Sequence, residues 1–180
     1  MNRRKFVVGA VASTCVATTA GVGWVSVDVG KSPLTISAVL GQLDNMRVKQ
    51  LTTVGEWSLS KILNHCAQSV EYSMFGFPKH KSDLFKKTLG SLAFSAFVAK
   101  NKMRHDLADE IPGAPLLASK SDLNAAYDRF GRSLRDFSSH RGLLYEHFAF
   151  GGLSKTEYEQ AHAMHFFNHL EEIRFKANPL

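Results

Sequence analysis

The sequence predicts an all-α protein, a bundle of helices with a signal segment in front of it. Apolar residues recur at helical spacing in five stretches, and outside the N-terminal segment no stretch shows the alternation of a β-strand. With 180 residues, of which 44% are hydrophobic and 21% charged, the chain has the composition of one globular domain. Its two cysteines cannot form a disulfide framework, so the core must come from packing.

The first two helices are expected over about residues 35–50 and 58–75, because apolar side chains recur there three or four positions apart. Ser58 is a suitable N-cap for the second helix, and Gly76 ends it. Cys66, the lone thiol if the N-terminal segment is removed, is expected in the core. The apolar stripes comprise Ile36, Val39, Leu40, Leu43 and Met46 in the first helix, and Ile62, Leu63, Cys66, Val70 and Met74 in the second.

A third helix is expected over about residues 82–103, and its apolar residues cover so wide an arc that we expect it to be well buried. Residues 109–119 contain Pro112, Gly113 and Pro115 and have no periodicity, which is typical of a connection. A fourth helix follows over about residues 121–138.

The last helix has the clearest start in the chain, because Ser154 and Glu157 have the spacing of a capping box. We expect this helix to extend to about Phe175. Five amphipathic helices in about 150 residues favour a helical bundle.

Residues 1–27 resemble an export signal, since Arg3, Arg4 and Phe6 precede an apolar stretch diluted by Gly and Thr. The arginine pair and the weak hydrophobicity favour the twin-arginine type and an exported, periplasmic protein. Two outcomes stay open: cleavage, with Ala20 as the last residue removed, or retention of residues 6–27 as an uncleaved membrane anchor.

The net charge of +6 falls to +3 without the basic residues at positions 3–5, and no basic run interleaved with aromatic residues follows. The sequence therefore gives no reason to expect nucleic-acid binding. Contact with a membrane is expected only through an uncleaved N-terminal segment. A homodimer is compatible with the sequence, which selects no oligomeric state.

Histidines gather on the last expected helix. His162, His165 and His169 lie within about 60° of one another around a helix axis, and the last two are four positions apart, so their imidazoles can converge on one ion. His65 lies amid apolar neighbours in the second helix and is the candidate third ligand. Buried or exposed histidines without a metal remain the alternative. Surface positions are expected for His80, His105 and His140, which have polar neighbours.

Two segments carry a family resemblance. Residues 147–173 read HFAFGGLSKTEYEQAHAMHFFNHLEEI, and the second helix reads WSLSKILNHCAQSVEY. The first resembles the C-terminal part of an uncharacterised domain family in the DinB/YfiT-like superfamily, where a His-Pro-x-Phe-Gly-x-Leu-Ser/Thr turn leads into a helix ending His-x-x-x-His. The second resembles that family's Leu-x-His-Cys helix. The resemblance implies a DinB-like four-helix bundle with long connections over residues 34–176.

The same resemblance implies that His65, His165 and His169 bind the metal. Three departures lie beside these ligands: Asn168 stands where the family often has His, Glu171-Glu172 where it favours Gln or Arg-Gln, and Phe148 where it has Pro. They put a shared substrate in doubt and leave the ligands unchanged. The residues expected to line the pocket or to support the ligands are His162, Gln68, Ser69, Asn168 and His147.

Three neutral histidines on a divalent cation, whether zinc, nickel or a similar metal, leave one coordination position for water or substrate. One hypothesis is therefore an exported metal-dependent enzyme, hydrolytic by default, that acts on a small molecule of unknown identity. The superfamily also contains thiol transferases, but export would separate this protein from cytoplasmic thiols. The alternative is a non-catalytic bundle that binds a metal or a small ligand, and a bundle whose histidines bind nothing remains a third.

Overall fold

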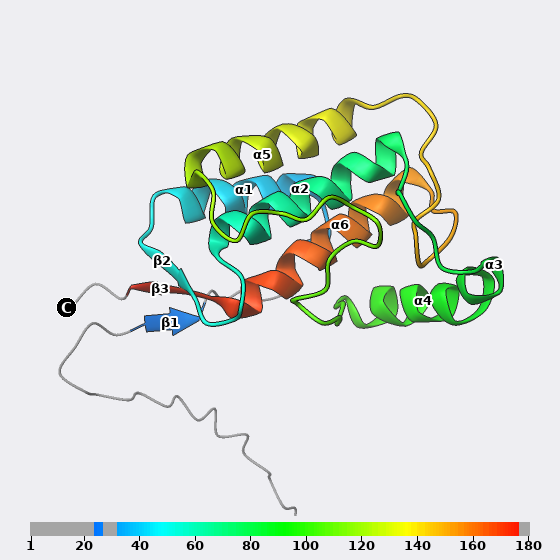
Figure 1. Cartoon of the computed structure of the whole chain (residues 1–180), viewed down its shortest axis with the longest axis horizontal. Coiled ribbons are helices and arrows are strands. Elements are labelled where there is room, and N and C mark those ends of the chain that lie inside the picture. The colour runs from blue at the N-terminus through cyan, green and yellow to red at the C-terminus, as the bar shows by residue number, and fades with distance from the viewer. Residues whose placement is uncertain (1–23, 27–31, 177–180) are drawn as a thin grey trace, which may run out of the picture.

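The computed structural model describes residues 24–26 and 32–176. Within these ranges the chain is mainly helical, with five helices of ten residues or more (Figure 1). This confirms the helical class that the periodicity predicts. The helices lie side by side, and a small sheet lies at one end of them.

Four long helices surround the main core. They are α1 (Ile36–Arg47), α2 (Leu59–Phe75), α5 (Leu123–Ser139) and α6 (Lys155–His169). Helices α1 and α2 each pack against both α5 and α6. The core between them includes large buried side chains from all four helices, among them Leu43, Leu63, Phe130 and Phe166.

Side-chain caps define where these helices begin. The side chain of Ser58 accepts a hydrogen bond from the backbone N–H of Lys61, as its position predicts. Ser154 and Glu157 form the expected capping box. Cys66 is buried in α2, where burial raises the pKa of its thiol, so its expected place in the core is confirmed.

The expected third helix is present over residues 83–100, with a π-helical segment inside it, but it is mostly exposed, so the predicted burial was wrong. A single turn, α3 (Asp83–Phe85), leads through a π-helical segment, Lys86–Gly90, into α4 (Ser91–Lys100). Helix α4 ends at Asn101, which adopts the left-handed conformation (φ 52°).

In this segment the apolar side chains are buried only where they contact the rest of the protein. Leu84, Leu89 and Leu92 have 75%, 63% and 68% of their surface exposed. Within α4 only Phe94 is buried, because the helix lies beside the four-helix core and not inside it (Figure 1). At Gly90 a Cβ atom would overlap the carbonyl oxygen of Ala149, so glycine permits the close approach of the two segments there.

The end of the chain also departs from expectation. Helix α6 stops at His169, a 3₁₀ turn covers Leu170–Glu172, and strand β3 (Ile173–Lys176) replaces the expected last helical turn. Strands β1 (Trp24–Ser26) and β2 (Leu51–Thr53) flank β3 in an antiparallel sheet. Strands of three or four residues are too short to show alternation, so the sequence pattern missed the sheet.

Most of the predicted signal segment, residues 1–23 and 27, lies outside the described residues, and β1 comes from its end. A helix both long and apolar enough to cross a membrane is absent from the part of the chain that the structure describes. The connection between α4 and α5, residues 101–122, has no regular helix or strand and contains the predicted 109–119 stretch.

Candidate metal centre

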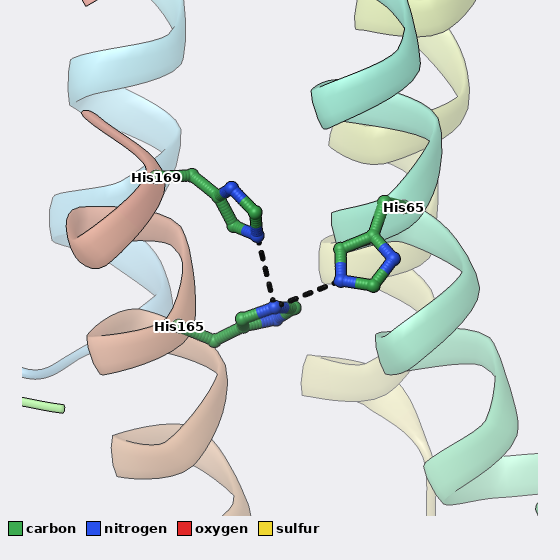
Figure 2. A group of neighbouring side chains, drawn as sticks. All are labelled: His65, His165 and His169. Atoms are coloured by element: carbon green, nitrogen blue, oxygen red, sulfur yellow. Dashed lines mark hydrogen bonds between the residues drawn. The ribbon is translucent and has the colours of Figure 1, made fainter. Parts of the chain in front are cut away.

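Two helices bring three histidines together. His65 lies in the middle of α2, and His165 and His169 lie one turn apart near the end of α6. The Nε2 atom of His165 is 3.1 Å from Nε2 of His65 and 3.2 Å from Nε2 of His169 (Figure 2). One ring nitrogen from each histidine lies within 4.8 Å of the other two. The structure thus places the three predicted ligands around one point.

Burial keeps these imidazoles neutral. Desolvation, with smaller contributions from the neighbouring histidines, lowers the pKa of His65 to about 3 and that of His169 to about 2. The same causes lower the pKa of His165 well below its ordinary value. At neutral pH all three rings therefore retain a nitrogen lone pair, which is the form that binds a metal.

Hydrogen bonding among the three rings does not satisfy them. A neutral ring nitrogen carries either one proton or one lone pair, yet Nε2 of His165 faces two other nitrogens at hydrogen-bond distance. Tetrahedral coordination at the usual Zn–N distance places ligand nitrogens about 3.3 Å apart. The two short separations are close to that value, so the donor set and its spacing fit a divalent cation.

The outer nitrogens of the trio also lack partners. Nδ1 of His65 and Nδ1 of His169 are buried without a hydrogen bond to the protein. Gln68 lies one turn along α2 from His65, and its Oε1 is also buried without a hydrogen bond to the protein. Its Nε2 is 3.4 Å from the carbonyl oxygen of Pro115. Gln68 therefore has a free acceptor beside the centre, consistent with a supporting role.

Trp57 forms a wall of the centre. Its ring meets His65 edge-on at 5.0 Å between centroids and stacks on His169 at 6.0 Å. Nζ of Lys61 lies 4.2 Å from the centre of the Trp57 ring and pairs with Glu110 at 2.7 Å. Sequence reasoning placed Trp57 only at the start of α2, because its contact with α6 arises from packing and leaves no periodic signal.

His105 also belongs to this cluster, so the expectation that it lies on the surface with polar neighbours was wrong. It is half-buried in the α4–α5 connection, and its ring lies 4.9 Å from that of His165 and 5.2 Å from that of His169. Nε2 of His105 is buried without a hydrogen-bond partner. Its polar sequence neighbours gave no indication of this position, which the path of the connection determines.

A cavity of about 330 Å³ adjoins the centre. His65, His105 and His165 lie along it, together with Ser69, one of the predicted pocket residues. Most of the surface is apolar, and the charged side chains along it have both signs: Lys81 and Arg104 are positive, and Asp109 and Glu110 are negative. The aromatic part of the lining is Phe85, Phe97, Phe148 and Phe150.

His162 and His147 also line the cavity, but their ring nitrogens bind the protein. Nε2 of His162 is 3.2 Å from the hydroxyl of Ser73, which itself donates to the carbonyl of Val70, so His162 is the donor. Nδ1 of His147 accepts hydrogen bonds from two backbone N–H groups of the turn at residues 147–151. Burial lowers the pKa of each to about 3.

Asn168 lies apart from the residues that line this cavity. It is buried and faces a smaller hollow of about 110 Å³, which Lys102 and Glu171 also line. Its Oδ1 has no hydrogen-bond partner. The departure from the family motif at this position therefore alters a hollow other than the one beside His65 and His165.

Sequence comparison gives one match, over residues 34–176, to the family described as protein of unknown function DUF1569. The chain belongs to this family. Neither the search of curated proteins nor the search of solved structures found a match. The family description assigns no activity, so the chemistry of the site carries the functional argument.

Proposed function

We propose that this DUF1569 member is an exported, DinB-like metal-dependent hydrolase whose divalent cation is bound by His65, His165 and His169. One observation carries the proposal: three neutral ring nitrogens converge beside a cavity that a small molecule can enter. When bound, the cation would supply Lewis acidity and lower the pKa of a water molecule.

The assignment to the DinB-like superfamily has three supports. Four long helices pack around one core, and long connections join them. The candidate ligands come from the second long helix and the last one, as the motif resemblance implies. The matched family region covers all four helices.

The cavity suggests the class of substrate. Its apolar lining would bind the apolar part of a small molecule, while Lys81, Arg104, Asp109 and Glu110 supply charges of both signs that could bind its polar part. Trp57 covers His65 and His169 from another direction and restricts water there. An ester, amide or phosphoester with an apolar group fits these features.

Export is proposed on the sequence of residues 1–27. Removal of the first 20 residues would leave β1 in the mature chain, where it can pair with β3. The twin-arginine pathway carries folded proteins, which suits a protein that acquires its metal in the cytoplasm. Mass spectrometry of the protein from a periplasmic fraction tests this, and an intact N-terminus in the cytoplasmic fraction would contradict it.

The metal test is elemental analysis of the purified protein. We expect about one equivalent of a divalent metal in the wild type, little in His169→Ala, and an unchanged content in His80→Ala, whose side chain is exposed. A metal-free wild type that also fails to take up zinc, nickel or cobalt would exclude the proposal.

Turnover separates catalysis from binding. A panel of ester, amide and phosphoester substrates should reveal hydrolysis that a chelator abolishes and metal restores. Non-catalytic metal binding is the second candidate function, and one observation favours it: the half-buried imidazole of His105 packs against two of the three candidate ligands. Stoichiometric metal with no turnover across the panel would support that alternative.

A further inference from the structure

We propose that His105 is a fourth nitrogen donor of this metal centre, supplied by the α4–α5 connection, and that it covers the coordination position that the three helix histidines leave open. The inference rests on the proposed metal site at His65, His165 and His169. With this fourth donor the metal has no permanently open coordination position. An incoming ligand must displace His105 or bind beside it.

The first support is the spacing of the rings. The rings of His65, His165 and His169 lie 4.9 to 5.2 Å apart between centroids. The ring of His105 lies at the same distances, 4.9 Å from His165 and 5.2 Å from His169. The ring of His105 thus contacts the two candidate ligands on α6, and the distances between ring centroids equal those within the trio.

The second support is the tautomer of His105. Its Nδ1 is 2.7 Å from the backbone carbonyl oxygen of Asp106, and a carbonyl can only accept, so Nδ1 carries the proton. In the neutral ring Nε2 then holds a lone pair. Metal-binding histidines commonly donate their other N–H to a carbonyl in this way, which fixes the ring and raises its basicity.

The third support is the unpaired state of that lone pair. Nε2 of His105 is buried and accepts no hydrogen bond. Leaving a buried acceptor unsatisfied costs on the order of 1 to 3 kcal/mol. Asp109 and Glu110 line the adjoining cavity but provide no donor. Among the described residues, the ring nitrogens that lie within 4.8 Å of one another are those of the trio, so this lone pair would reach a cation there once the His105 ring moves toward the trio.

The connection is anchored on both sides of His105. Met103 and Ile111 are buried, and the backbone N–H of Lys102 donates to the carbonyl of Phe97. The backbone N–H of Ala108 donates to the side chain of Asp106. These contacts determine where His105 lies, while the irregular backbone can shift and move the ring, together with its bond to Asp106, toward the metal.

The consequence is a site with controlled access. Four histidine nitrogens complete the tetrahedral coordination that closed zinc sites have. His105 lies along the same cavity as His65 and His165, so a small molecule that enters this cavity meets His105 at the metal. The α4–α5 connection then controls whether the cation is available to a ligand.

Cobalt(II) titration of the metal-free protein provides the test. We compare the wild type with His105→Ala, with His80→Ala as the exposed-histidine control, and with His169→Ala. We expect His105→Ala to bind cobalt about 10- to 100-fold more weakly in chelator competition. Its visible absorption spectrum should change, whereas His80→Ala should match the wild type.

Two further measurements distinguish loss of a ligand from loss of the fold. Free imidazole, which fits the cavity, should restore the wild-type spectrum of His105→Ala. X-ray absorption of the cobalt-loaded wild type needs no substitution, and we expect four imidazole nitrogens there.

The outcomes separate this inference from the metal site itself. If the wild type binds cobalt and His169→Ala does not, but His105→Ala keeps the wild-type affinity and spectrum, the fourth ligand is refuted and the trio stands. Three imidazoles in the X-ray absorption of the wild type would also refute it. If the wild type binds no cobalt, the proposed function fails as well.

Discussion

Two groups of histidines lie at or beside the same cavity, and they differ in what their nitrogens bind. His65, His165, His169 and His105 form the first group, and His147 and His162 form the second. Burial lowers the pKa of His65 and of His162 alike to about 3. A low pKa therefore does not distinguish a metal ligand from a histidine of the core.

Hydrogen bonding does distinguish them. In the second group, Nε2 of His162 binds Ser73, and Nδ1 of His147 binds the backbone of the 147–151 turn. Neither residue has a buried nitrogen without a partner. The first group has three such nitrogens, one each on His65, His105 and His169. Nε2 atoms that converge on one another, on rings whose other nitrogens lack a protein partner, are the better indication of a metal site.

The largest expected effect is the loss of metal in His169→Ala. Removing one of the three helix ligands should weaken the affinity by more than about 100-fold, the upper end of what loss of a supporting partner costs, because only His65 and His165 then bind from the helices. Competition with a chromophoric chelator measures this. An affinity within about tenfold of the wild type would place the metal elsewhere and remove the basis of the comparison.

The second group should respond in the opposite way. His162→Ala should destabilise the fold by about 3 kcal/mol, because it removes an aromatic ring packed between Tyr158 and Phe137 and leaves Ser73 without its donor. Urea denaturation measures the free energy of unfolding, and elemental analysis should find the metal content unchanged. Loss of metal from a folded His162→Ala protein would contradict the distinction.

Acid should weaken the metal-free protein through the same residue. The folded pKa of His162 is about 3 and the ordinary value is 6.5, so between these pH values the unfolded chain binds more protons than the folded one. The contribution of His162 to the free energy of unfolding is therefore fully present above pH 6.5. Between pH 6.5 and the folded pKa it decreases by about 1.4 kcal/mol for each pH unit of acidification. His162→Phe should lower the pH slope by one proton, and an unchanged slope would argue against a neutral buried His162.

The smallest expected effect is at His147. His147→Asn keeps an acceptor near the position of Nδ1 and should cost about 1 kcal/mol, while His147→Ala should cost about 2 kcal/mol because two backbone N–H groups lose their acceptor. Thermal unfolding of both variants measures the difference. Equal losses would show that stacking on Phe150, and not the hydrogen bonds, accounts for the role of His147.

Local patterns predicted much of this molecule. The capping box at Ser154 and the cap at Ser58 depend on residues three positions apart, and both form as expected. The convergence of His165 and His169 follows from helical spacing, and His65 was selected by its apolar surroundings. The caps and the His165–His169 pair are fixed within one or two turns of a helix, whereas the approach of His65 to them depends on the packing of α2 against α6.

The features that were missed depend on distant contacts. Strand β3 forms because β1 and β2, far away in the sequence, pair with it. Leu84 and Leu92 are as apolar as core residues but stay exposed, while Phe94 of the same segment packs with Ala161 and Met164 of α6. His105 joins the cluster because buried residues anchor an irregular connection, and no periodicity describes such a path.

The small sheet links the beginning of the described chain to the end of α6. His169 is followed by one 3₁₀ turn and then by β3, the middle strand, whose two edges are held by β1 and β2. A recombinant chain that starts after Ser26 would lack β1 and expose one edge of β3. Its C-terminal turn would fray more easily, so a shortened chain would lose metal faster than one that retains Trp24.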